Sequence, residues 1–236
     1  MKRAFITGAN RGIGLALTEA LADHGLFVFA GARAPDQAQE LSGLGERHPD
    51  RIRIVPLEVT SDVSVRHCAE AVQEGTGTLD LLVNNAAVFL EETDTPLADL
   101  DPDWFAQTVA VNVGGVARVT KALLPALRAA GAARVVNISS GAGSIGDKTN
   151  AQFYCYGASK AALNHLTVGL AHELRSSGIM VVALSPGWVR TDMGGPGAEL
   201  VPRESARAIA ETILKLEPAD SGRFLDRFGH QGQYVW

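Results

Sequence analysis

The 236-residue chain has 46% apolar and 20% charged residues, which is ordinary for a globular protein and argues against disorder. Its net charge of -5, without a basic cluster, gives no support for nucleic-acid binding, and its two cysteines form neither a disulfide framework nor a metal site. No apolar window is long enough for a signal peptide or a membrane span, so we expect a cytoplasmic protein without membrane or metal binding.

Short apolar runs alternate with helical patterns along the chain. The runs predict strands over 3–7, 26–32, 52–57, 79–83, 135–138 and 179–184, with a seventh at 224–225. Helices are predicted over 12–24, 63–73, 101–130 in two parts, 156–176 and 202–216. Such alternation implies parallel strands joined by right-handed crossovers. We therefore expect an α/β fold: one doubly wound Rossmann-type domain over 1–236, with a mainly parallel sheet of about seven strands and helices on both faces.

Glycines cluster between the first predicted strand and the first helix, in T-G-A-N-R-G-I-G at 7–14. At such a turn, glycines permit a tight bend, close approach to a pyrophosphate and close packing of helix on strand. The N-terminus of the following helix offers free N–H groups to phosphates. The pattern predicts a dinucleotide site, and the alternative is a tight turn without a ligand.

The end of the second strand bears on which dinucleotide binds. An acidic residue there binds the ribose 2′-OH of NAD, but this chain reads A-G-A-R at 30–33, with no carboxylate before Asp36. Arg33, flanked by Arg11, suits a 2′-phosphate because a guanidinium donates paired hydrogen bonds. We favour NADP(H), with NAD(H) as the alternative and two solvent-paired surface arginines as the interpretation without a ligand.

Three further patterns carry candidate chemistry. Tyr156 and Lys160 lie one turn apart on a predicted helix, and an ammonium there favours a phenolate that can exchange protons with a carbonyl or alcohol. Ser139 and Ser140 end the fifth strand, where one hydroxyl can donate to a substrate oxygen. Asn112 is an amide in an apolar helical stretch, either functional or a satisfied core residue. Taken alone, each pattern also fits ordinary packing.

In combination, the motifs resemble the short-chain dehydrogenase/reductase family. T-G-x-x-x-G-x-G, N-N-A at 84–86, a helical Asn, S-S, Y-x-x-x-K and P-G at 186–187 follow in the family's order over nearly the whole chain. The resemblance implies that Tyr156 is the general acid/base and that Lys160 lowers its pKa and holds the nicotinamide ribose. It implies that Ser140 holds the substrate oxygen and that Asn112 keeps a water in a proton relay. The implied reaction is NADP(H)-dependent reduction of a ketone or aldehyde.

The resemblance also implies a set of cofactor contacts spread along the chain. They are Gly8, Asn10, Gly12, Ile13 and Gly14 in the glycine turn, Glu58 and Val59 around the adenine, Asn85 and Ala86 at the adenosine ribose, Tyr156 and Lys160, and Pro186, Gly187, Val189 and Thr191 at the nicotinamide. The charge pattern adds Arg11 and Arg33 at the 2′-phosphate. Two positions depart from the family pattern: Ala87 replaces a glycine and Glu58 replaces an aspartate. The segment between Ser140 and Tyr156 is also long, which implies a reshaped substrate mouth.

Within the family, the stretch 185–195 and the ending 229–236 are most similar to the C-factor and sniffer-like carbonyl reductases. Residues 192–201 predict a substrate lid. The family implies a homodimer or homotetramer. A cofactor-binding signalling or regulatory protein with little turnover is the alternative function. Apolar residues near the motifs are predicted pocket walls, with core packing as the alternative: Val88, Phe89, Leu90, Ile145, Phe153 and Trp188.

Overall fold

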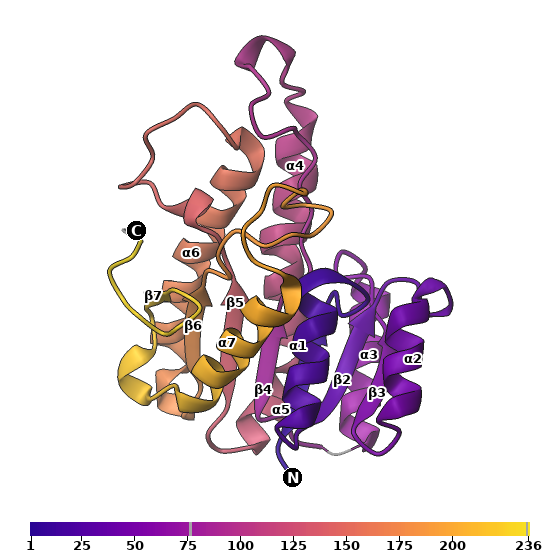
Figure 1. The fold of residues 1–236 in the computed structure, drawn as a ribbon. Coiled ribbons are helices and arrows are strands. Elements are labelled where there is room, and N and C mark those ends of the chain that lie inside the picture. Colours follow the sequence, from indigo (N-terminus) through magenta and orange to yellow (C-terminus); the bar gives the residue numbers. More distant parts are fainter. Residues whose placement is uncertain (76, 235) are drawn as a thin grey trace.

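A seven-stranded parallel sheet forms the centre of the molecule (Figure 1). The computed structural model describes residues 1–75, 77–234 and 236, and Thr76 and Val235 lie outside the description. The strands are β1 (Arg3–Thr7), β2 (Phe27–Ala32), β3 (Ile52–Pro56), β4 (Leu81–Asn84), β5 (Arg134–Ile138), β6 (Met180–Leu184) and β7 (Phe224–Leu225). Their order is β3-β2-β1-β4-β5-β6-β7, and every pair is parallel. The predicted doubly wound α/β fold is confirmed.

Helices cover both faces of this sheet (Figure 1). They are α1 (Gly12–Asp23), α2 (Gln39–Arg47), α3 (Asp62–Gly75), α4 (Asp103–Val109), α5 (Val116–Ala129), α6 (Tyr154–Leu174) and α7 (Pro202–Lys215). Helices α1, α2 and α7 pack on one face, and α3, α5 and α6 pack on the other. A π-helical turn, Ala110–Gly115, joins α4 to α5. None of the described helices is long and apolar enough to cross a membrane.

Alternating strand residues build two hydrophobic cores, one on each face. In β1, Ala4 and Ile6 belong to the core under α1, α2 and α7, whereas Phe5 belongs to the opposite core. In β2, Val28 and Phe29 divide in the same way. Because both faces are buried, the strands read as continuous apolar runs instead of alternating apolar and polar residues. This is why the runs could be recognised in the sequence.

The strand order reverses at the boundary between β1 and β4, since β1 continues to β2 on one side and pairs with β4 on the other. In an open parallel sheet, ligands bind at the carboxyl ends of the strands beside such a reversal. The glycine turn follows β1, and the N-N-A motif follows β4. The fold therefore brings these two sequence motifs into contact, at the upper edge of the sheet in Figure 1.

Candidate active site

The glycine turn is too closely packed for larger residues. Gly8 and Gly12 have φ angles of 65° and 56°, which favour glycine. A Cβ atom on Gly14 would lie 2.1 Å from the Gly8 carbonyl oxygen and 2.5 Å from Asn85 Nδ2. The turn also lies beside the end of β2, because Ala9 N–H donates to a β2 carbonyl at 2.9 Å. This geometry is consistent with the predicted roles of the glycines in a tight bend and in close packing of the helix on the strand.

The N-terminus of α1 supplies donors suited to a phosphate. The Arg11 side chain does not cap α1, and the first turn of α1 contains no acidic residue. Asn10 and Ile13 are half-buried in the same turn. First-turn N–H groups have no partner within their own helix, and the helix end carries partial positive charge. The residues present therefore fit a bound pyrophosphate.

Arg33 lies just past β2 with its side chain 80% exposed. Its Nη1 atom is 3.8 Å from Glu58 Oε2, while Glu58 Oε1 accepts hydrogen bonds from the backbone and hydroxyl of Thr60. Glu58, which is predicted to border the adenine, is thus also an ion-pair partner of Arg33, which is predicted to bind the 2′-phosphate. Val59 turns inward, where a Cβ on Gly115 would lie 2.8 Å from its Cγ2 atom, so its side chain belongs to the core.

The N-N-A motif ties β4 to the glycine turn. Asn85 Nδ2 donates to the carbonyl oxygens of Thr7 and Gly8, both at 3.0 Å. The N–H groups of Asn85 and Ala86 both donate to Thr7 Oγ1 at 2.9 Å. Ala87 has no positive φ angle, so the local turn is built without the glycine that the family pattern has there. These bonds hold the end of β4 against the glycine turn.

Tyr156 and Lys160 share one face of α6. Lys160 Nζ lies 5.5 Å from the centre of the Tyr156 ring and donates a 2.8 Å hydrogen bond to the carbonyl oxygen of Ile138, at the end of β5. Lys160 is only 2% exposed. The predicted pairing of phenol and ammonium within one helical turn is therefore present in the folded chain.

Burial moves the pKa values of both groups. It raises the pKa of Tyr156 to about 12, although a hydrogen bond with Ser140 opposes the rise. It lowers the pKa of Lys160 to about 8. The sequence led us to expect a lowered phenol pKa from the nearby ammonium. In the chain by itself, the loss of solvent outweighs that attraction, because an apolar environment disfavours phenolate and ammonium alike.

The two serines after β5 have separate surroundings. Ser139 is buried, and its hydroxyl donates to Asn164 Oδ1 at 2.6 Å. Ser140 is half-buried, accepts a hydrogen bond from Ala142 N–H at 3.1 Å and shares a hydrogen bond with Tyr156. Only Ser140 therefore faces the phenol, and this arrangement agrees with its selection over Ser139.

The Asn112 side chain is fully engaged. Its Oδ1 accepts from Val88 N–H at 2.8 Å, and its Nδ2 donates to the Val88 carbonyl at 3.0 Å and to Ser159 Oγ at 3.0 Å. Ser159 Oγ in turn donates to the carbonyl of Tyr156 at 2.7 Å. The amide lies in the π-helical turn and joins the segment after β4 to α6. This geometry matches the alternative of a satisfied core amide.

The segment after β6 closes over the glycine turn. Pro186 is buried and its carbonyl accepts a hydrogen bond from Ser205 Oγ, and Gly187 has a φ angle of 80°. The Thr191 methyl group is the nearest neighbour of Gly12, at 3.1 Å from its ideal Cβ position. Val189 is buried and pairs with Leu200 as an isolated parallel bridge.

The predicted lid, 192–201, is folded against the residues before it. Trp188 Nε1 donates to the Gly194 carbonyl at 2.9 Å, and Arg190 donates to the Ala198 carbonyl at 3.1 Å. At its start, Asp192 forms an ion pair with Arg11 in the glycine turn. The segment thus reaches from the end of β6 to the glycine turn after β1.

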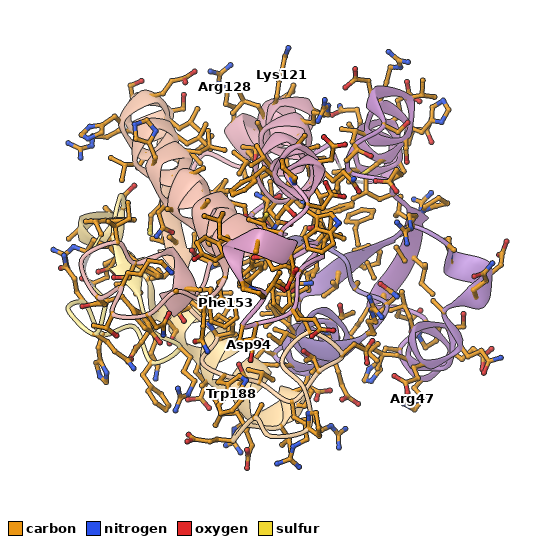
Figure 2. All side chains as sticks on the ribbon, turned by 90° about the horizontal axis from the view of Figure 1, so that it is seen from above. Arg47, Asp94, Lys121, Arg128, Phe153 and Trp188 are labelled. Carbon is orange, nitrogen blue, oxygen red and sulfur yellow. The ribbon has the colours of Figure 1, made fainter. Side chains whose placement is uncertain are left out.

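An aromatic cluster borders the phenol. The rings of Phe89 and Tyr156 are 5.2 Å apart, and the Phe153 ring lies 5.8 Å from Phe89 and 6.3 Å from Tyr156. Figure 2 looks down on this edge and labels Phe153 and Asp94 near the middle of the view and Trp188 below them, from the segments after β5, β4 and β6. Val88 is half-buried, whereas Leu90, Ile145 and Trp188 are exposed.

One close neighbour of the site was not predicted. Glu91 is 4% exposed, and its Oε1 atom accepts hydrogen bonds from the N–H groups of Cys155 and Tyr156, both at 2.9 Å. These residues are 64 and 65 positions apart from Glu91 in the chain. No local spacing in the sequence signals such a contact, and the family motifs do not include it.

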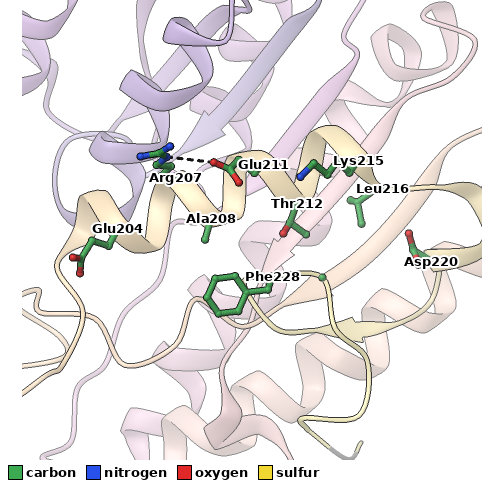
Figure 3. Close-up of a pocket in the computed structure, with 10 residues that line it drawn as sticks. Glu204, Arg207, Ala208, Glu211, Thr212, Lys215, Leu216, Asp220 and Phe228 are labelled. Carbon is green, nitrogen blue, oxygen red and sulfur yellow. Dashed lines mark hydrogen bonds and ion pairs between the residues drawn. The ribbon is translucent and has the colours of Figure 1, made fainter.

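A separate hollow of about 550 Å³ lies beside α7 (Figure 3). Half of its lining residues are charged, namely Glu204, Arg207, Glu211, Lys215 and Asp220, and Phe228 lies on the opposite side. Arg207 and Glu211 form an ion pair there. None of the predicted site residues lines this hollow.

Comparison with known proteins gives the family of the chain. A family model described as short chain dehydrogenase matches residues 2–199. The chain therefore belongs to the short-chain dehydrogenase family, whose members include oxidoreductases.

Several individual proteins are similar to this chain. C-signal of Myxococcus xanthus is 42% identical over 154 residues, covering 65% of this chain and 92% of that protein. The carbonyl reductase Sniffer of D. melanogaster superimposes with a TM-score of 0.94 at 31% identity, covering all of both chains. An NADPH-bound carbonyl reductase from chicken fatty liver has a TM-score of 0.88 and 35% identity over 100% of this chain and 99% of that one. The predicted resemblance to C-factor and sniffer-like proteins is confirmed.

Proposed function

We propose that this protein is an NADP(H)-dependent carbonyl reductase that reduces a ketone or aldehyde to an alcohol. The observation that carries the proposal is the convergence of the Tyr156 phenol, the Ser140 hydroxyl and the Lys160 ammonium at the carboxyl end of β5, on the same sheet edge as the glycine turn after β1. The likeness to an NADPH-bound carbonyl reductase supports the choice of cofactor. The two exposed arginines near the turn support it independently, because guanidinium groups suit a 2′-phosphate.

The chain's own residues bind and orient the reactants. The turn from Gly8 to Gly14 and the N-terminus of α1 hold the pyrophosphate, and Arg33 and Arg11 hold the 2′-phosphate by exchanging their carboxylate partners for it. When bound, the nicotinamide supplies the hydride to the carbonyl carbon. The remaining residues that we propose to contact the cofactor are Asn10, Ile13, Glu58, Val59, Asn85, Ala86, Pro186, Gly187, Val189 and Thr191.

Tyr156 donates the proton that the substrate oxygen requires. With its pKa raised to about 12, the phenol keeps its proton at neutral pH, which suits reduction better than oxidation of an alcohol. Ser140 donates to the same substrate oxygen and orients it. Lys160, held by the Ile138 carbonyl, binds the nicotinamide ribose and supplies positive charge as the phenol gives up its proton.

Two further assignments complete the proposal. Asn112 connects Val88 to α6 through Ser159. Because its side-chain amide is already bonded there, we assign the proposed water relay toward Lys160 to the Asn112 backbone in the π-helical turn. The segment 192–201 acts as a lid that opens when the Arg11–Asp192 ion pair breaks. We also propose that residues 1–236 form one domain that carries the whole site.

We also propose that the chain assembles as a homodimer or homotetramer. The outer face of α6 carries the small exposed residues Ala158, Ala162 and Gly169, and the space beside Gly169 is open for 4 Å. Small residues permit two helices to approach closely. Light scattering coupled to size-exclusion chromatography measures the mass directly, and a monomer at micromolar concentration contradicts this assignment.

The similarity to C-signal favours one alternative, a cofactor-binding signalling protein with little turnover. The two functions separate in one experiment: the purified protein is incubated with NADPH and a panel of ketones and aldehydes, and loss of NADPH is followed. Carbonyl reductase activity predicts substrate-dependent NADPH oxidation with matching alcohol formation. Tight NADPH binding without turnover across the panel favours the signalling function.

A further inference from the structure

The catalytic helix α6 begins without a cap of its own. The residue before it, Phe153, has the left-handed angles φ 57° and ψ 52°, and its side chain accepts no hydrogen bond from the helix. First-turn N–H groups of a helix need partners from outside it. Glu91 is the partner of two of these N–H groups, since its Oε1 atom accepts hydrogen bonds from Cys155 N–H and Tyr156 N–H at 2.9 Å each. The start of α6 is therefore held by a residue from the segment after β4.

This carboxylate is buried at a cost. Glu91 is 4% exposed, and its Oε2 atom is buried and accepts no hydrogen bond from the residues that the structure describes. Burying a charged group is unfavourable unless hydrogen bonds and nearby positive charge offset the loss of water. The two N–H donors and the positive end of α6 supply that offset. A serine or aspartate at the helix start would cap it without burying a distant charge.

The Glu91 segment holds Tyr156 from two sides. One of the two N–H groups that it binds belongs to Tyr156 itself. The ring of Phe89, two residues earlier, packs at 5.2 Å from the Tyr156 ring. Two residues later, the Thr93 carbonyl accepts from Phe153 N–H at 3.2 Å. Both the backbone and the ring of Tyr156 therefore rest on residues 89–93.

We propose that Glu91 is a positioning residue for carbonyl reduction: by binding the N–H groups of Cys155 and Tyr156, it fixes the first turn of α6 and so the place of the Tyr156 phenol. Glu91 acts through the backbone and takes no part in proton transfer. This inference rests on the proposed function, because its effect is read as turnover. A displacement of about 1 Å in a reacting group can lower a rate by about 100-fold.

The first test compares Glu91→Ala, Glu91→Gln and the matched control Glu92→Ala, which alters an exposed neighbour. Glu91→Ala is expected to lower kcat by about 10- to 100-fold, with KM and the Kd for NADPH within about twofold of the parent. Glu91→Gln keeps an oxygen acceptor and should restore most of kcat. Glu92→Ala should match the parent. A folded Glu91→Ala variant with parental kcat overturns the proposal.

A double-mutant cycle separates positioning from general weakening of the fold. If Glu91 acts through the phenol, Glu91→Ala has little further effect on the residual kcat of Tyr156→Phe. A purely structural role predicts the same proportional loss in both backgrounds, and that result overturns the proposal. If Glu91→Ala does not fold, Glu91→Asp replaces it: its shortened side chain withdraws the acceptor, so it must lose more kcat than Glu91→Gln.

The same cycle distinguishes failure of this inference from failure of the proposed function. Parental turnover in Tyr156→Phe removes the carbonyl reductase mechanism itself. A large loss in Tyr156→Phe together with parental turnover in Glu91→Ala leaves the mechanism intact and removes only the role of Glu91.

Discussion

Lys160 lies over the face of the Tyr156 ring, with Nζ 5.5 Å from the ring centre, and donates its hydrogen bond to the Ile138 carbonyl. The ammonium is thus anchored to the end of β5 while it shares a helix face with the phenol. Burial moves the two pKa values apart, to about 12 for Tyr156 and about 8 for Lys160. The site therefore holds a protonated phenol beside a cation that gives up its proton more readily than an exposed lysine.

The shifted lysine predicts a pH-dependent stability. The folded chain has a Lys160 pKa of about 8 against an ordinary 10.5, so between these values it binds fewer protons than the unfolded chain. The free energy of unfolding should then rise as pH increases from 8 toward 10, by at most about 1.4 kcal/mol per pH unit. The raised pKa of Tyr156 has the opposite effect on stability. It adds to the free energy of unfolding below pH 10, and this addition is lost as the pH rises toward 12.

Replacement of the lysine isolates this contribution. In Lys160→Met, the rise in the free energy of unfolding between about pH 8 and pH 10 should be absent. Urea titrations of the parent and the variant at several pH values measure the difference. Parallel curves for the two proteins contradict the shifted pKa of Lys160.

The two serines predict different effects on kcat for one chemical change. Ser140→Ala removes the hydroxyl beside Tyr156 and should lower kcat by about 100-fold or more; it also removes the bond from Ala142 N–H, which should lower the free energy of unfolding by about 0.5–1 kcal/mol. Ser139→Ala removes the buried 2.6 Å bond to Asn164 and should lower the free energy of unfolding by about 1 kcal/mol. Steady-state kinetics and thermal unfolding of both variants check the assignment, and exchanged phenotypes contradict it.

The glycine turn predicts a severe effect from a single methyl group. Gly14→Ala places a Cβ atom 2.1 Å from the Gly8 carbonyl oxygen, so the turn must shift. NADPH binding should be lost, and the melting temperature should fall. The matched control is Gly43→Ala in α2, where the nearest atom is a flexible arginine end at 3.8 Å; it should stabilise the helix by about 0.5–1 kcal/mol. Normal NADPH binding by Gly14→Ala contradicts the placement of the dinucleotide.

Charge near the end of β2 predicts the choice of dinucleotide. Arg33→Ala should raise the Kd for NADPH by about 10- to 100-fold, while the Kd for NADH stays within about twofold, because only NADPH carries the 2′-phosphate. Arg47→Ala in α2 changes an exposed arginine whose partner is Glu19, outside the predicted contacts, and serves as the control. Fluorescence titrations with both dinucleotides provide the measurement. Equal losses for NADPH and NADH contradict the role of Arg33.

Local patterns in the sequence predicted much of the fold and site. The strands are recognisable because both faces of the sheet are buried, and Tyr156 and Lys160 are recognisable because a helix brings i and i+4 together. Helix α2 was not predicted, since Gly43 and Gly45 weaken its helical pattern and only Leu41 and Leu44 are buried in it. Helix α6 also begins earlier than predicted, at Tyr154.

Contacts between distant segments were beyond local patterns. Glu91 reaches α6 across 64 residues, and the left-handed angles of Phe153 have no signal in a residue type that rarely adopts them. Likewise, Asn112 could be recognised as a buried amide, but its partners Val88 and Ser159 depend on the tertiary fold. Such contacts are set by how the elements pack, and spacing along the chain does not encode them.

The most direct measurement is NADPH-dependent carbonyl reduction by Tyr156→Phe beside the parent, with NADPH affinity measured for both. Removal of the hydroxyl leaves the ring to pack against Phe89 but removes the proton donor. We predict that kcat falls by about 10²- to 10⁴-fold while the Kd for NADPH is unchanged. Turnover by the variant close to that of the parent would contradict the central role of Tyr156.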